Sequence, residues 1–343
     1  MMMRMHATFM PPALTVTFGC LLFALPTLAA SPPQSPDLYV GRFFNNDVQR
    51  FFGPQSARPG DDHPGPGSSG SQFSRQPVSR RPWGIAFGPD GNLYVANQQG
   101  GDGAIMRIKG PFAADAGAPA PVQGRTDDVF VATGNFMTLA FGLDQNLYAG
   151  IGGPIQRFDV ATGASLGDFT SGRVPARVEG IAFGPDQNLY VSSFNDCVPG
   201  PACTTTTGEI LRFDGKTGRF IDVFVASASG GLQHPGGIAF GTNGDLFVCN
   251  EFVDSTSTGE VLRFHGPLNA AAGQPFAAAG QPGARFARSA GISPIQLTFG
   301  PDRTLYITHD GGVIAYNGRS GVEMGSFASV SGARGLAFYS GAQ

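Results

Sequence analysis

The side chains in this sequence that are best suited to catalysis or metal binding are Glu179, Glu251, His309 and Asp310. Carboxylate oxygens are the ligands that hard divalent cations such as Ca²⁺ and Mg²⁺ prefer. A histidine beside such an ion, either His309 or His234, could act as a general base. The alternative is a structural role, because acidic and amide residues directly after a strand often only cap a turn.

Other common catalytic arrangements have no support in the sequence. It contains no Ser-His-Asp pattern, no phosphate-binding loop, no HExxH motif and no paired CxxC motif. The formal net charge is -3 and the pI is near 5.9. No basic stripe is present, so we expect no nucleic-acid partner.

The elements that would position these side chains come from a repeated phrase. It reads GIAFGPDGNLYV at 84, TLAFGLDQNLYA at 138, GIAFGPDQNLYV at 180, GIAFGTNGDLFV at 237 and QLTFGPDRTLYI at 296. A sixth copy is split between GLAF at 335–338 and DLYVG at 37–41. Repeats at such intervals are typical of solenoids, propellers or arrays.

Each unit predicts four antiparallel strands. The apolar GIAF run is followed by a tight turn and by LYV, and a third strand such as ILRF at 210 and a weaker fourth strand come next. Four such strands make one propeller blade. We therefore predict an all-β, six-bladed β-propeller with four-stranded blades, closed by the N- and C-terminal strands in one blade. We expect Trp83 and the repeated phenylalanines to pack between blades.

A propeller has two faces, and the variable loops of this repeat all fall on one of them. Variable loops on a fixed scaffold are where binding sites usually lie. The residues that precede the first strands or follow the second strands should therefore meet around the central channel. We predict catalytic roles for His309, Glu251 and His234, ligand binding by Trp83, Asn97, Asn195 and Arg334, and metal binding by Glu179, Asn250 and Asp310.

The first thirty residues predict a secretory signal peptide. A basic start precedes the apolar run ALTVTFGCLLFAL at 13–25, and small residues at Ala29 and Ala30 form a cleavage site. The alternative is a transmembrane anchor, but the run is short for a span and a proline follows it. We expect residues 31–343 to form one secreted or periplasmic domain, monomeric and without a membrane span.

Cysteines and biased segments complete the organisation of the chain. In an oxidising compartment Cys197 and Cys203 could close a small disulfide ring, although a metal-binding pair is the rival interpretation. Cys249 alternates with apolar residues, which predicts a buried free thiol. Residues 53–82 are rich in Pro, Gly and Ser, and we expect a surface excursion there.

The repeat resembles that of NHL-type six-bladed propellers, and two enzyme families with this scaffold look similar. The Glu179-Gly180 pair before IAF is similar to the EGP start of the gluconolactonase (senescence marker protein) family. That resemblance implies one divalent metal held by an acidic residue, an asparagine and an aspartate. Residues 234–248 resemble a PNGIA-type motif of the same family, although Gly236 stands where its asparagine is expected.

Streptogramin B lyases are similar in the rhythm of the repeat. Glu251 falls one place later than their pattern, and no HGI motif matches their histidine. We therefore expect an exported propeller that binds a small molecule, a protein or a peptide on the channel face, and the sequence makes no cofactor certain. The alternative is a lactonase or lyase that depends on Ca²⁺ or Mg²⁺ and uses Glu179, Asn250, Glu251 and His309.

Overall fold

The computed structural model describes residues 36–63, 70–74, 81–98, 104–195, 207–251 and 258–339. The chain divides into two units, Met1–Gln34 and Ser35–Gln343, and all described residues belong to the second. The predicted signal peptide and the predicted Cys197–Cys203 disulfide lie outside the described residues, so both stay predictions. None of the helices in the described ranges has the length and hydropathy that a membrane crossing requires.

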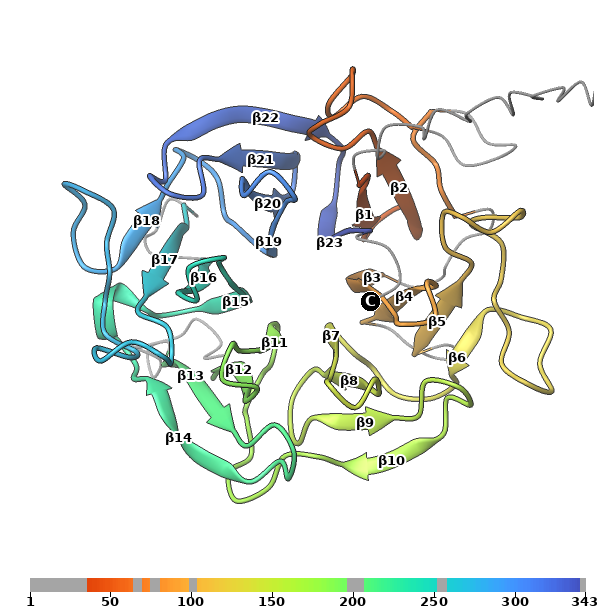
Figure 1. Cartoon of the computed structure of the whole chain (residues 1–343), viewed down its shortest axis with the longest axis horizontal. Coiled ribbons are helices and arrows are strands. Elements are labelled where there is room, and N and C mark those ends of the chain that lie inside the picture. Colours follow the sequence, from red (N-terminus) through yellow and green to blue (C-terminus); the bar gives the residue numbers. More distant parts are fainter. Residues whose placement is uncertain are drawn as a thin grey trace, which may run out of the picture. The chain divides into compact units, whose positions relative to one another are not determined.

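The described strands form six antiparallel sheets around a central axis, which confirms the predicted propeller (Figure 1). We name each blade after its innermost strand. The β3 blade holds β3 (Pro82–Phe87), β4 (Leu93–Asn97), β5 (Ile105–Ile108) and β6 (Val129–Val131). The β7 blade holds β7 (Thr138–Phe141), β8 (Leu147–Gly150), β9 (Gln156–Phe158) and β10 (Ser165–Asp168). The β11 blade holds β11 (Ile181–Phe183), β12 (Leu189–Phe194), β13 (Gly208–Phe213) and β14 (Phe220–Val225).

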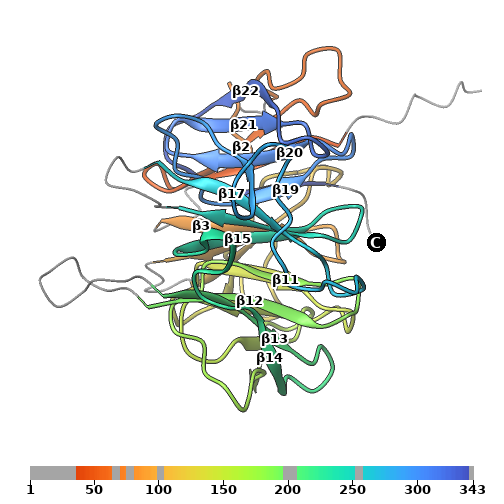
Figure 2. The same cartoon turned by 90° about the vertical axis from the view of Figure 1, so that its left-hand side faces the viewer.

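Two further blades follow the same order. The β15 blade comes after a short 3-10 turn, η1 (Ser229–Gly231), and holds β15 (Pro235–Phe240), β16 (Leu246–Asn250), β17 (Glu260–Phe264) and β18 (Arg285–Ala287). The β19 blade holds β19 (Leu297–Phe299), β20 (Leu305–His309), β21 (Gly312–Tyr316) and β22 (Glu323–Ser329). Figure 2 shows the sheets from the side, with their inner strands running between the two faces.

The sixth blade closes the ring with both ends of the domain, as predicted. Its inner strand β23 (Ala333–Phe338) pairs with β1 (Leu38–Arg42), and β1 pairs with β2 (Asp47–Phe51). The register places Val40 opposite Leu336. Pairing the two ends removes the open edges that a linear array of sheets would leave.

The β23 blade corrects one detail of the prediction, because it has three strands in the described residues instead of four. The segment after β2 lies along the outer edge, where isolated bridges join Gln49 to Gln72 and Phe51 to Asp62. Phe73 in this segment is fully buried. Part of the predicted surface excursion at 53–82 therefore packs at the position that a fourth strand occupies in the other blades.

An aromatic residue in the second strand of each blade contacts two phenylalanines. The Tyr94 ring lies 5.0 Å from Phe141 of the next blade and 4.9 Å from Phe130 in its own outer strand. The same arrangement repeats around the ring at Tyr39, Tyr148, Tyr190, Phe247 and Tyr306. Edge-to-face aromatic packing of this kind stabilises beyond simple burial of area. The repeated phenylalanines thus pack between blades, as predicted.

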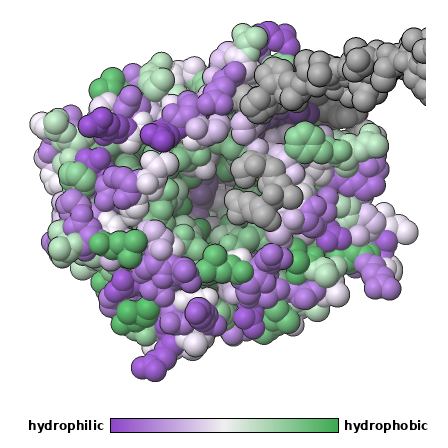
Figure 3. Space-filling view, viewed as in Figure 1, coloured by the Kyte–Doolittle hydropathy of each residue, from purple (hydrophilic) through white to green (hydrophobic). Residues whose placement is uncertain are grey.

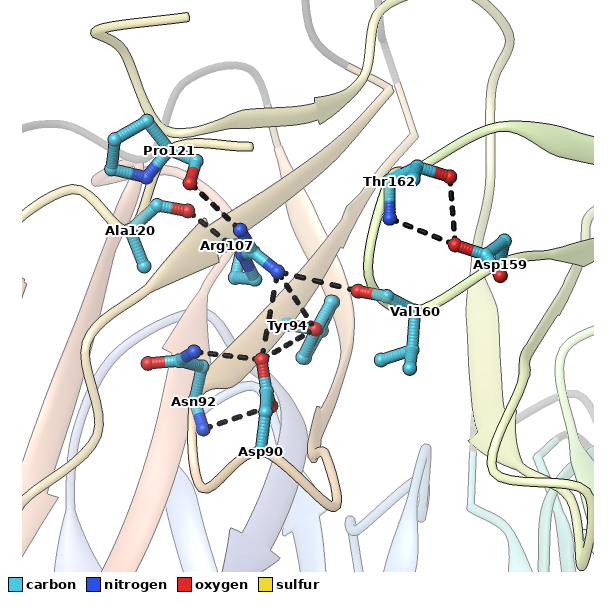
Figure 4. Close-up of polar contacts among 9 residues, drawn as sticks. All are labelled: Asp90, Asn92, Tyr94, Arg107, Ala120, Pro121, Asp159, Val160 and Thr162. Atoms are coloured by element: carbon cyan, nitrogen blue, oxygen red, sulfur yellow. Dashed lines mark hydrogen bonds and ion pairs between the residues drawn. The ribbon is translucent and has the colours of Figure 1, made fainter. Parts of the chain in front are cut away.

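In four blades the tight turn is tied to the same tyrosine, as Figure 4 shows for the β3 blade. The Asp90 carboxylate accepts hydrogen bonds from the Asn92 side chain at 2.7 Å and from the Tyr94 hydroxyl at 2.9 Å. Arg107 donates to the Ala120 carbonyl at 2.8 Å and reaches the Val160 carbonyl of the next blade at 3.3 Å. The recurring Asp, Asn and Tyr residues of the repeat therefore stabilise the turn, and Arg107 links the blade to the next one.

The inner strands approach each other closely where the phrase begins with glycine. A Cβ atom on Gly180 would lie 2.5 Å from the Gly236 carbonyl oxygen, and one on Gly335 would lie 2.5 Å from the Trp83 carbonyl oxygen. Neither distance is tolerable for a side chain, so the ring of inner strands is narrow there. The space-filling view down the axis shows a hollow near the centre of the ring (Figure 3).

The aromatic contact makes a direct prediction for stability. Replacing Tyr94 by Ala should lower the free energy of unfolding by about 3–5 kcal/mol, because a large buried ring is lost from a junction between blades. Tyr94→Phe keeps the ring and removes only the hydroxyl bond to Asp90, so it should cost about 1 kcal/mol. Urea unfolding of the two variants measures the difference. Equal losses would contradict the dominance of ring packing.

Candidate functional site

A cavity of about 580 Å³ lies among the residues that flank the inner strands on the variable-loop face. Seven of the ten predicted site residues line it, namely Trp83, Glu179, His234, Glu251, His309, Asp310 and Arg334. The remaining lining residues are Arg177, Gly291, Ser293 and Ile295. The structure therefore brings together most of the residues that the repeat placed on this face. Their functional roles stay predictions.

The sequence analysis missed Arg177, although a signal was present. Arg177 stands two residues before Glu179, and alternate residues of an extended segment point to the same side. Its Nε donates to Glu179 Oε1 at 2.9 Å. Arg177 therefore supplies a positive charge at the point where Glu179 enters the cavity wall.

Two carboxyl groups, Glu179 and Glu251, lie within hydrogen-bonding reach of each other. Both residues are buried. Glu179 Oε2 and Glu251 Oε1 accept no hydrogen bond from any other described group. Burial, followed by the nearby Glu179 charge, raises the pKa of Glu251 well above its usual range. The two groups are close enough to share one proton, and neither of these oxygens has a donor from elsewhere in the described residues.

Arg334 lies on the other side of the cavity against aromatic rings. Its guanidinium is 5.1 Å from the Trp83 ring and 5.2 Å from the Phe43 ring. Arg334 Nη1 donates to Asp310 Oδ1 at 2.7 Å and to the Ala333 carbonyl at 2.9 Å. The buried Nε of Arg334 and Nε1 of Trp83 have no hydrogen-bond partner among the described residues. This side of the cavity therefore offers donors.

The two histidines of the cavity differ in their surroundings. His309 Nδ1 accepts a hydrogen bond from the Gly311 amide at 3.1 Å. Burial lowers the pKa of His309, against the opposing charge of Asp310. His234 Nδ1 lies 3.8 Å from Glu251 Oε2. Burial therefore favours the neutral form of His309.

The cavity also has an apolar wall. Phe43, Trp83, Met137 and Ile295 form one buried cluster, and Ile151 packs against it. Trp83 and Ile295 from this cluster line the cavity itself. An apolar wall opposite buried polar groups is the usual composition of a small-molecule site.

The three predicted asparagines do not line this cavity. Asn250 is fully buried, and its Oδ1 accepts from the Gln233 and His234 amides at 3.0 and 2.9 Å. Its Nδ2 donates to the Gly231 carbonyl at 3.0 Å. Asn250 thus anchors the segment before β15, which is the capping role named above as the alternative.

The other two asparagines lie elsewhere on the loop face. Asn97 ends β4 and is fully buried. Asn195 donates to Thr207 Oγ1 at 3.3 Å and lines a separate depression of about 250 Å³. Neither is brought to the central cavity.

The residues predicted to hold a metal do not form a ligand set. Glu179 pairs with Arg177, Asn250 spends its amide on backbone groups, and Asp310 pairs with Arg334. Within the described residues, no three His, Cys, Asp or Glu side chains are grouped as a metal centre requires. The donor set therefore does not fit the metal site that the gluconolactonase resemblance implies.

Gln296 holds one wall of the cavity, and it is one of the residues that directly precede a first strand. It stands where four of the other five copies of the repeat begin with glycine. Its Nε2 donates to the Glu179 carbonyl at 2.6 Å, across the top of the intervening β15 blade. This bond holds the backbone that carries one of the two carboxyl groups.

Comparisons with solved structures support the fold. A gluconolactonase from Xanthomonas campestris aligns with a TM-score of 0.54 at 16% identity, covering 75% of this chain and 79% of its own. A protein of unknown function from Bacteroides caccae aligns with a TM-score of 0.54 at 14% identity, covering 90% and 100%. Virginiamycin B lyase from Staphylococcus aureus reaches only 0.41 at 15% identity, covering 74% and 71%.

No protein-family model and no curated protein match the sequence. At these identities the structural similarities show a shared fold and nothing about activity. The resemblance to six-bladed propellers of the gluconolactonase type is thus confirmed at the level of fold.

The Glu251 environment predicts a pH effect on stability. Its pKa is raised on folding, so the folded state holds its proton more tightly than the unfolded state. Stability should therefore fall as pH rises above about 4.5, by up to about 1.4 kcal/mol per unit, until the folded pKa is passed. Glu251→Gln should remove this slope, because it keeps the shape and cannot ionise. Parallel slopes in the two proteins, measured by urea unfolding between pH 4 and 8, would contradict it.

Proposed function

We propose that this chain is an exported propeller that binds a small polar molecule in the central cavity of its variable-loop face. The observation that carries the proposal is the set of buried polar atoms without partners in one cavity. Native proteins rarely leave such groups unsatisfied, because each costs about 1–3 kcal/mol. Glu179, Glu251, Trp83 and Arg334 all contribute one, and all line the cavity.

The size and charge of the cavity support a small molecule over a protein partner. A volume of about 580 Å³ is in the range of small-molecule sites. Arg177 pairs with Glu179, and Arg334 pairs with Asp310, so the lining carries little net charge when Glu251 is protonated. The ligand we propose is therefore neutral overall.

A metal-dependent lactonase or lyase is the second candidate. What favours it is the carboxyl pair, because Ca²⁺ or Mg²⁺ could take the place of the proton between Glu179 and Glu251. The predicted partners Asn250 and Asp310 are held by other groups, as described above. We therefore place binding without chemistry first.

A thermal-shift screen of residues 31–343 tests both candidates. Small neutral polar compounds should raise the melting temperature, since a ligand at 100 times its Kd stabilises by about 2.7 kcal/mol. Glu251→Ala should abolish the shift, because it removes one wall of the polar side. Ca²⁺, Mg²⁺, Mn²⁺ and Zn²⁺ should leave the melting temperature unchanged. A shift with a metal alone would favour the enzyme, and no shift with any compound would sink the binding proposal.

Export has its own test. The N-terminal thirty residues support cleavage after Ala29 or Ala30. Expression of the full chain in a bacterial host should release a mature protein beginning at Ala30 or Ser31 into the periplasm or medium. N-terminal sequencing and cell fractionation measure this outcome. A full-length chain retained in the cytoplasm would contradict it.

A further inference from the structure

One side of the central cavity presents two buried carboxyl groups. Glu179 and Glu251 are 2% and 6% exposed, and each has an oxygen that no donor outside the pair reaches. The Arg177 guanidinium donates to Glu179, and the charges of Arg334 and Arg177 both act on Glu251. The oxygens that no other donor reaches could still accept from one ammonium group of a ligand. We call these two residues the acceptor side.

The opposite side carries donors. Trp83 and Arg334 are each 9% exposed, and in the part of the chain that the structure describes Trp83 Nε1 and Arg334 Nε have no hydrogen-bond partner. Asp310 pairs with Arg334, but its side chain is 79% exposed, so solvent weakens its effect on the buried end of the guanidinium. An anionic acceptor would satisfy both donors. We call Trp83 and Arg334 the donor side.

The ring places the two sides across the channel from each other. Inner strands are neighbours in the order β23, β3, β7, β11, β15, β19 and back to β23 (Figure 1). Glu179 precedes β11, which lies opposite the β23 strand of Arg334. Glu251 follows β16 of the β15 blade, which lies opposite the β3 strand of Trp83. Both members of each side therefore face the members of the other.

We propose that the cavity selects a zwitterion, such as an ω-amino acid or a short peptide with free ends. Its ammonium group would bind Glu179 and Glu251, and its carboxylate would bind the Trp83 indole and the Arg334 guanidinium. Charge-assisted hydrogen bonds at both ends are stronger than neutral ones. This inference rests on the proposed binding function and names the class of ligand for that site.

Simpler ligands satisfy only part of the cavity. A metal cation or a simple amine leaves the donor side unpartnered, and a simple carboxylate leaves the acceptor side unpartnered. A neutral polyol can bond to both sides but supplies no charge to either. A zwitterion is neutral overall and matches both sides, which agrees with the balanced charge of the lining.

The experiment compares matched compounds by isothermal titration calorimetry with residues 31–343. The probes are 4-aminobutanoate, 6-aminohexanoate and glycylglycine, each with its N-acetylated and its C-amidated form. At least one zwitterion should bind, and blocking either end should weaken it by about ten-fold or more. The probes differ in the distance between their ammonium and carboxylate groups, so their relative affinities show which length fits across the channel.

Variants assign each end to its side. Glu251→Gln and Glu179→Gln should weaken the zwitterion about ten-fold and leave its N-acetylated form unchanged. Arg334→Gln should weaken the zwitterion about ten-fold and leave its C-amidated form unchanged. Arg334→Lys keeps the charge and the packing of the side-chain stem, so it covers the case in which Arg334→Gln does not fold. Arg173 and Glu209 form an ion pair on the same face outside this cavity, so Arg173→Gln and Glu209→Gln serve as matched controls with unchanged binding.

The outcomes separate this inference from the binding function. Equal binding of blocked and free compounds, or a response confined to neutral polyols, would overturn the zwitterion and leave binding in place. If none of these probes binds but another compound raises the melting temperature in the thermal-shift screen, the zwitterion is overturned and binding stays in place. If no compound binds in the calorimetric titration or in the thermal-shift screen, both the binding function and the zwitterion are overturned.

Discussion

The ring depends on one aromatic side chain per blade that is held between two phenylalanines. Tyr94 shows the pattern, because its ring contacts Phe141 of the next blade and Phe130 of its own outer strand. Its hydroxyl also bonds to the Asp90 turn, so the same residue sets the hairpin and the junction. Six such contacts, together with the pairing of β1 and β23, close the ring of blades on itself.

This rigid ring explains how side chains far apart in the sequence form one cavity. Inner strands that pass as closely as those at Gly180 and Gly335 bring the residues before them to a common centre. Glu179 and Arg334 lie in opposite blades, far apart in the sequence, and still line the same cavity. The scaffold supplies the positions, and the residues that flank the strands supply the chemistry.

Much of this could be predicted from the sequence, because the repeat reports on strand ends directly. The blade count, the closure and seven of the predicted site residues follow from the phrase and its split copy. The roles of individual side chains could not follow, since they depend on partners in other blades. Asn250 turned inward to backbone groups, and Gln296 reached a carbonyl two blades away. Phe73 packed from a segment whose composition indicated only a surface loop.

The central claim is that two unsatisfied carboxyl groups face two unsatisfied donors across the channel of a closed ring. A crystal structure of residues 31–343, at a resolution that shows ordered water, tests it most directly. The account predicts Glu179 and Glu251 in contact, with water or ligand between them and the Trp83–Arg334 pair. A direct ion pair between Arg334 and either glutamate, or a cavity filled by the protein's own side chains, would contradict it.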